Sequence, residues 1–112
     1  MDYTVRFTSV ARKDLRGIHA WIATNDSMEN ANYVAREIVR VALTLREFPQ
    51  RGAHPPELLL QNNRSFRQLL FKPYRIFYRI SAKTVFIALI ADGRRDMVSL
   101  LAMRFLLDNK LM

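Results

Sequence analysis

Arginine is the residue type in this sequence that is best suited to binding chemistry, and its distribution is uneven. Residues 1–63 carry eight basic and seven acidic side chains, whereas residues 64–112 carry ten basic and three acidic ones. Fourteen of the eighteen basic residues are arginine, whose planar guanidinium offers a fork of donors to carboxylate or phosphate oxygens. Almost all of the net charge of +8 therefore belongs to the second half, which predicts an acidic protein or a nucleic acid as partner.

The remaining residue types offer little for catalysis or metal binding. The chain has no cysteine and only two, isolated histidines, so it lacks a ligand set for a metal. Its three glycines do not form a phosphate-binding loop. His54 is a candidate base because imidazole titrates near neutral pH, although its proline-rich surroundings favour a solvated residue, and His19 is expected to pack or to lie at the surface. We expect no cofactor, and an independent small-molecule enzyme is disfavoured.

The length and composition limit the chain to one domain. With 112 residues and 50% hydrophobic content, the chain can build a single core, so we expect residues 1–112 to form one domain. No apolar run is long enough to span a membrane. The first twenty residues include several charged side chains and lack the apolar core of a signal peptide. Together with the absence of cysteine, this favours a reducing, cytoplasmic location.

The N-terminal residues predict a strand that leads into a helix. Residues 3–7 alternate with a period of two and are rich in β-forming types, which indicates a short strand. Thr8 and Ser9 are suitable N-cap residues, and the apolar positions that follow recur at helical spacing. A first amphipathic helix is therefore predicted over residues 10–24.

A second helix is predicted to follow after a short turn. Asp26, with Glu29 three residues later, resembles a capping box. The apolar stripe of this helix runs from Ala31 to Phe48, and Pro49 ends it. Because so short a turn brings consecutive helices side by side, the two helices are predicted to form an antiparallel hairpin.

The second half predicts a β-meander and a last helix. Residues 49–63 are rich in proline, glycine and asparagine and indicate a surface connection. Three β-type segments follow, at residues 64–71, 74–80 and 84–91, with links short enough to require hairpins. A helical pattern begins at Met97. The fold class predicted is α+β, with an N-terminal strand and a helical hairpin packed on a mainly antiparallel sheet.

The middle β-segment has two different faces, and the segment after it is apolar on both, as expected of a covered central strand. On the middle segment, Arg75, Phe77 and Arg79 share one face. The opposite face is expected to carry Tyr74, Ile76, Tyr78 and Ile80.

In order and spacing, these segments resemble the RelE/ParE superfamily of toxins from bacterial type II toxin-antitoxin systems. The resemblance covers nearly the whole chain. It rests on the joint order and spacing of the segments, since no single motif is diagnostic. The segments that carry it are residues 11–15 (ARKDL), Phe48-Pro49 with Gly52 beyond them, residues 66–80, and residues 92–97 (DGRRDM).

Two activities occur on the fold that this resemblance implies. RelE-type toxins enter the ribosomal A site and cleave messenger RNA, whereas ParE-type toxins poison DNA gyrase. Arg75 and Arg95 match two arginines of the RelE nuclease pattern. Its lysine pair, however, falls on Arg67 and Gln68 or Leu69, and its tyrosine falls on Leu101.

Cleavage at a 2′-hydroxyl needs a base and an acid besides cations, and this pattern supplies neither. The chain instead resembles the ParE branch at its end, where a basic turn opens the terminal helix. Asp96 is expected to cap that helix. By this resemblance, the target-binding residues are Arg94, Arg95 and Arg104, and the antitoxin-binding residues are Arg75, Phe77 and Arg79. If the chain were a nuclease, its catalytic residues would be Arg67, Arg75 and Arg95.

The resemblance also implies the partners. A cognate antitoxin, acidic and partly disordered, would bind the toxin in a hetero-oligomer, either adding a strand at an open sheet edge or laying a helix between the hairpin and the sheet. DNA gyrase is the expected target, with growth arrest and plasmid stabilisation as the outcome. The alternatives are a ribosome-dependent messenger RNA endonuclease and a degenerate module that only binds an antitoxin. No membrane partner is expected.

Overall fold

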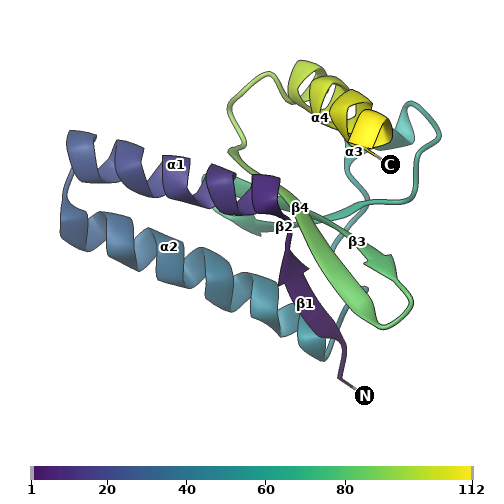
Figure 1. The fold of residues 1–112 in the computed structure, drawn as a ribbon, viewed down its shortest axis with the longest axis horizontal. Coiled ribbons are helices and arrows are strands. Elements are labelled where there is room, and N and C mark those ends of the chain that lie inside the picture. Colours follow the sequence, from purple (N-terminus) through teal and green to yellow (C-terminus); the bar gives the residue numbers. More distant parts are fainter. Residues whose placement is uncertain (1, 112) are drawn as a thin grey trace.

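The computed structural model describes residues 2–111, with side chains described as far as Arg104. A four-stranded sheet carries the α1–α2 hairpin on one face and the helices α3 and α4 on the other (Figure 1). The predicted α+β class with a helical hairpin on a mainly antiparallel sheet is confirmed. The elements are β1 (Thr4–Phe7), α1 (Ser9–Asn25), α2 (Met28–Leu43), a 3₁₀ turn η1 (Thr44–Arg46), α3 (Pro56–Leu59), β2 (Arg67–Phe71), β3 (Tyr74–Ser81), β4 (Thr84–Asp92) and α4 (Met97–Leu111).

Strand β4 occupies the middle of the sheet, whose order is β1-β4-β3-β2. It pairs with β1 in parallel and with β3 in an antiparallel hairpin, so both of its edges are occupied along its first half. Seven of its nine residues are apolar, and most are buried. The predicted central strand, covered on both faces, is therefore confirmed.

A bulge in β4 changes which residues face each core. The register with β3 shifts between Phe77, which pairs with Leu89, and Tyr78, which pairs with Ile87. Ala88 is the extra residue, as in a β-bulge. Ile87 and, beyond the bulge, Ile90 consequently belong to the core beneath the helical hairpin. Leu89 and Ala91 belong to the second core, beneath α4.

The helical hairpin forms as predicted, but its second cap differs. Thr8 caps α1 by accepting a hydrogen bond from the Ala11 backbone N–H. The cap of α2 is Ser27, whose hydroxyl accepts from the Asn30 backbone N–H at 3.0 Å, so the prediction of an Asp26 capping box is wrong. A serine hydroxyl one residue later caps equally well, and Asp26 instead accepts from the Asn30 side chain.

The end of α2 and the loop after it depart from the prediction. Helix α2 tightens into the 3₁₀ turn η1, where Leu45 is fully buried, and Phe48 is 63% exposed and not part of the apolar stripe. The expected surface connection contains the single turn α3, where Leu58 is buried in the second core. Pro56 at the start of α3 has the backbone angle that a first helical residue needs.

Candidate functional site

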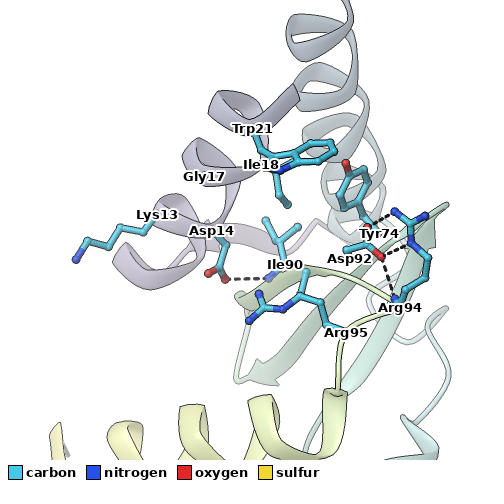
Figure 2. A pocket seen from close by; sticks show the side chains of 11 residues that line it. Lys13, Asp14, Gly17, Ile18, Trp21, Tyr74, Ile90, Asp92, Arg94 and Arg95 are labelled. Carbon is cyan, nitrogen blue, oxygen red and sulfur yellow. Dashed lines mark hydrogen bonds and ion pairs between the residues drawn. The ribbon is translucent and has the colours of Figure 1, made fainter. Parts of the chain in front are cut away.

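A groove of about 600 Å³ lies between α1 and the carboxyl end of β4. Figure 2 shows the Trp21 indole extending from α1 toward the ring of Tyr74, the first residue of β3. The indole is 65% exposed. Burial and the nearby Asp92 carboxylate raise the pKa of the Tyr74 hydroxyl. The remaining lining residues come from one face of α1 and from the end of β4 with its following turn: Lys13, Asp14, Gly17, Ile18, Ile90, Ala91, Asp92, Arg94 and Arg95.

The groove exists because β1 is shorter than β4. The last backbone bond from the β1 side is donated by the Thr8 N–H to the Ile87 carbonyl. Beyond it, the Ile90 N–H donates to Asp14 Oδ2 at 3.0 Å instead of to a strand. Because the N–H and C=O of one residue point to the same side of a strand, the Ile90 carbonyl also faces this open edge.

Arg104 of α4 closes the start of the open edge. Its guanidinium donates to the Ala88 carbonyl at 2.9 Å and to both Asp14 carboxylate oxygens, at 3.2 and 2.9 Å. The two side chains are only 11% and 16% exposed. Arg104 therefore links α1, β4 and α4 within the fold. The sequence had predicted a different role for it, a contact with the target.

Arg94 and Arg95 lie where they were expected, in the turn between β4 and α4. Both are exposed at the rim of the groove. Arg94 donates to the Asp92 carboxylate (Figure 2), whereas the Arg95 side chain makes no hydrogen bond or ion pair within the part of the chain that the structure describes. Asp96 caps α4 as expected, because its carboxylate accepts from Ser99, and these bonds lower the pKa of Asp96.

The Asp92–Arg94 pair predicts a dependence of stability on acid. Hydrogen bonds from the Arg94 guanidinium lower the pKa of Asp92 from 3.8 to about 2. Since the folded pKa is depressed, the pair stabilises the fold above the unfolded pKa, and this contribution is lost as pH falls through the window from 3.8 to about 2. In the Asp92→Asn variant, the melting temperature should therefore decrease less steeply as pH falls through that window. Thermal unfolding followed by circular dichroism measures this. Identical slopes for variant and parent would contradict this.

Arg75 is held within the fold on the face of the sheet beneath α3 and α4. It forms a two-pronged pair with Glu57 of α3, with both N–O distances at 2.8 Å, and donates to Gln68 at 2.7 Å. Its guanidinium also lies 4.8 Å from the centre of the Phe77 ring. The hydrogen bonds from Arg75 lower the pKa of Glu57. Phe77 is fully buried in the second core, so its side chain is not accessible to an antitoxin in this conformation.

Of the positions matched to the nuclease pattern, Arg75 and Gln68 are in contact, whereas Arg67 is bound elsewhere. Arg67 donates to the backbone carbonyls of Gln50 and Gly52, at 3.1 and 2.8 Å. Leu101, at the tyrosine position, is 1% exposed in the second core, and Leu69 is buried in the first. Arg67 is therefore oriented by the loop before α3, and Arg75 by Glu57.

Arg79 and His54 both line a second pocket, of about 240 Å³, which lies beyond the start of β2. Arg79 stacks over the Phe86 ring at 4.6 Å, and His54 Nδ1 hydrogen-bonds the Phe66 carbonyl at 3.0 Å. His19 links the two hairpin helices through a 2.8 Å bond to Asn32. Within residues 2–104, no group of acidic and histidine side chains could hold a metal ion. None of the helices described is long and apolar enough to cross a membrane.

Sequence reasoning missed Asp14 and Glu57, the two carboxylates that bind Arg104 and Arg75. Asp14 lies 90 residues from Arg104 in the chain, so no local pattern relates them. A signal did exist for Glu57, since acidic residues that follow a Pro-Pro pair favour the first turn of a helix.

Comparison with known proteins supports the fold. Structures similar to this chain include the chromosomal ParDE system of P. aeruginosa, with a TM-score of 0.68, 22% identity, and coverage of 80% of this chain and 95% of that one. The RelBE2 toxin-antitoxin complex of Mycobacterium tuberculosis matches with a TM-score of 0.61, 26% identity and coverage of 82% and 92%. A free E. coli RelE double mutant matches at 0.59, with 13% identity and coverage of 88% and 92%.

No curated protein matches the chain at a significant level. Residues 5–97, in contrast, match the family model described as the ParE toxin of the type II toxin-antitoxin system parDE. The resemblance deduced from the order of the segments is therefore confirmed: the chain belongs to the ParE toxin family of type II toxin-antitoxin systems.

Proposed function

We propose that this protein arrests growth by binding DNA gyrase and stabilising its DNA-cleaved state, and that an acidic antitoxin keeps it inactive. The observation that carries the proposal is the pairing of Arg75 with Glu57. An arginine neutralised by a two-pronged carboxylate is poorly placed to stabilise a developing phosphate charge. The tyrosine position of the nuclease pattern is filled by the buried Leu101. These features favour a gyrase-binding toxin over the ribosome-dependent endonuclease.

Arg94 and Arg95 are the proposed target contacts. They project from the turn before α4, where both are exposed. Arg95 has no carboxylate partner within residues 2–104. Arg94 is paired with Asp92 but is 80% exposed, so it can exchange that carboxylate for a phosphate or carboxylate of the target without a rearrangement of the fold. Arg104 is not included, because three bonds hold it within the fold.

The groove between α1 and β4 is the proposed antitoxin site. Its open edge presents the Ile90 carbonyl, which an added strand could pair with. The exposed Trp21 indole offers a large apolar contact, and Arg95 at the rim offers a charge for an antitoxin carboxylate. An extended acidic segment with an apolar side chain would satisfy all three.

Expression of the chain alone should stop growth, and DNA metabolism should fail before translation. Purified toxin should inhibit supercoiling by gyrase and accumulate cleaved DNA, and Arg94→Gln with Arg95→Gln should remove most of this effect. Arg16→Gln with Arg36→Gln, two exposed arginines of the hairpin, is the control with the same change of charge. Cleavage of messenger RNA in a translation extract, with gyrase unaffected, would establish the endonuclease instead. Normal growth would indicate a degenerate antitoxin-binding module.

Trp21→Ala should weaken capture of the antitoxin by about thirtyfold, since exposed aromatics at interface centres often contribute about 2 kcal/mol to binding. The antitoxin is sought as the product of a short acidic reading frame beside this gene, and affinity is measured by titration calorimetry. Phe48→Ala is the matched control, because Phe48 is 63% exposed and Trp21 65%, but Phe48 lies outside the groove. Equal affinities of both variants would place the antitoxin elsewhere.

A further inference from the structure

The second pocket gathers positive charge at the open edge of β3. Strand β2 pairs with β3 only from Arg67, opposite Tyr78, so β3 continues without a strand neighbour on that side. The space of about 240 Å³ that results is lined by Arg64, Arg67 and Arg79, together with His54 and Ser65. All its charged lining residues are basic, which distinguishes it from the groove, where two carboxylates take part.

These arginines are oriented, but no carboxylate neutralises them. The ion pairs found within residues 2–104 involve neither Arg64, Arg67 nor Arg79. Arg79 is held by the Phe86 ring, 4.6 Å from its guanidinium carbon. Arg67 uses one terminal nitrogen for two carbonyls, which leaves the other donors of its fork for a ligand. Arg67 pairs with Tyr78 and Arg79 projects from the opposite face, so the two arginines flank the sheet edge from its two sides. A bound anion at this edge would lower the repulsion between their charges.

His54 and Ser65 add neutral polar groups to the pocket. Since a carbonyl can only accept, the 3.0 Å contact with the Phe66 carbonyl assigns the hydrogen of the His54 ring to Nδ1. Nε2 is then an acceptor and makes no bond to a phosphodiester oxygen, whereas the Ser65 hydroxyl can donate to one. Guanidinium forks with a hydroxyl form a donor set with several directions, which suits the tetrahedral oxygens of a phosphate better than one planar carboxylate.

We infer that this pocket binds a phosphodiester of a nucleic-acid backbone through Arg64, Arg67 and Arg79. The site is distinct from the antitoxin groove, because the groove contains Tyr74 at the start of β3 and the pocket contains Arg79. At about 3.3 Å per residue these positions lie roughly 17 Å apart along the strand. The inference goes beyond the proposed function and does not depend on the antitoxin site or on gyrase.

The test measures binding of a short fluorescein-labelled oligouridylate to the full chain, made by cell-free synthesis, by fluorescence anisotropy. Arg79→Gln and Arg64→Gln should each raise the dissociation constant by about tenfold, as expected for loss of a charged hydrogen bond. Each should also lower the slope of log affinity against log salt by about 0.7, the value for one phosphate contact on a single strand. Inorganic phosphate should compete with the oligonucleotide.

The control is Arg36→Gln, which removes the same charge from an exposed position of α2 and should change affinity by less than about twofold. If all three variants weakened binding equally, net charge alone would explain the binding, and the inference would be overturned. Displacement by polyglutamate but not by phosphate would overturn it too, because the pocket would then take protein carboxylates. Melting curves establish whether the variants fold. If Arg79→Gln does not fold, Arg64→Gln provides the test, because Arg64 is exposed on the surface.

Discussion

Replacing Gly52 with alanine is expected to destabilise the fold by about 3 kcal/mol or more, as severe overpacking at a rigid site does. An added Cβ would lie 2.5 Å from the Gln68 carbonyl oxygen and 2.7 Å from the Tyr78 hydroxyl. Neither neighbour can yield, because Gln68 is within β2 and Tyr78 is fully buried. The Tyr78 hydroxyl also accepts from the Gly52 N–H and donates to the Pro49 carbonyl, so the substitution disturbs the link between the loop and the core.

Gly17→Ala is the matched control for this prediction. Apart from neighbouring residues and the backbone of α1 itself, no atom lies within 4 Å of the Cβ that would be added at Gly17, and the residue is in the interior of α1. Alanine should therefore stabilise the fold by up to about 1 kcal/mol through helix propensity. Urea unfolding of both variants measures the difference, and a Gly52→Ala protein as stable as its parent would show that the loop relaxes freely.

Arg104→Met is expected to cost about 3 kcal/mol of stability, because it leaves the Asp14 carboxylate largely buried without its cation. The Ala88 carbonyl loses its donor as well. Of the groups within residues 2–104 that donate to Asp14, the Ile90 N–H alone would remain. Since the pair connects α1, β4 and α4, the variant should also loosen α4, which hydrogen exchange of its backbone amides would detect.

A double-mutant cycle with Asp14→Asn isolates the pair. The coupling energy between Asp14 and Arg104 should reach about 2 kcal/mol, because the partners touch and are shielded from water. The pair of Glu37 with Arg40 serves as the control: Arg40 is 62% exposed, so solvent and salt screen the interaction and its coupling should be near zero. A coupling energy near zero for both pairs would show that the contact between Asp14 and Arg104 does not stabilise the position of α4.

Periodicity in the sequence determined the type and order of most elements. The alternation in β3 placed Arg75 and Arg79 on the face opposite Tyr78, as the structure has them, because a strand exposes successive side chains on opposite sides. The bulge at Ala88 could not be predicted. Strand β4 is apolar on both faces, so a slip by one residue leaves the same hydrophobic pattern.

Local chemistry was less decisive where several residues could act alike. Asp26 and Ser27 are both good N-caps, and only the path of the turn selected Ser27. The turn α3 is too short to produce a helical period, and tertiary burial of Leu58 accounts for its position.

The sequence by itself determined that the second half is cationic and that the segments follow the order of the ParE family. The tertiary structure decided which cations are paired within the fold and which are left exposed. Arg75 and Arg104 are paired with Glu57 and Asp14, from segments far away in the chain, whereas Arg95 is exposed at the groove. The physical reason is that charge is a property of each residue, but pairing depends on distances of a few ångströms that only the folded chain establishes.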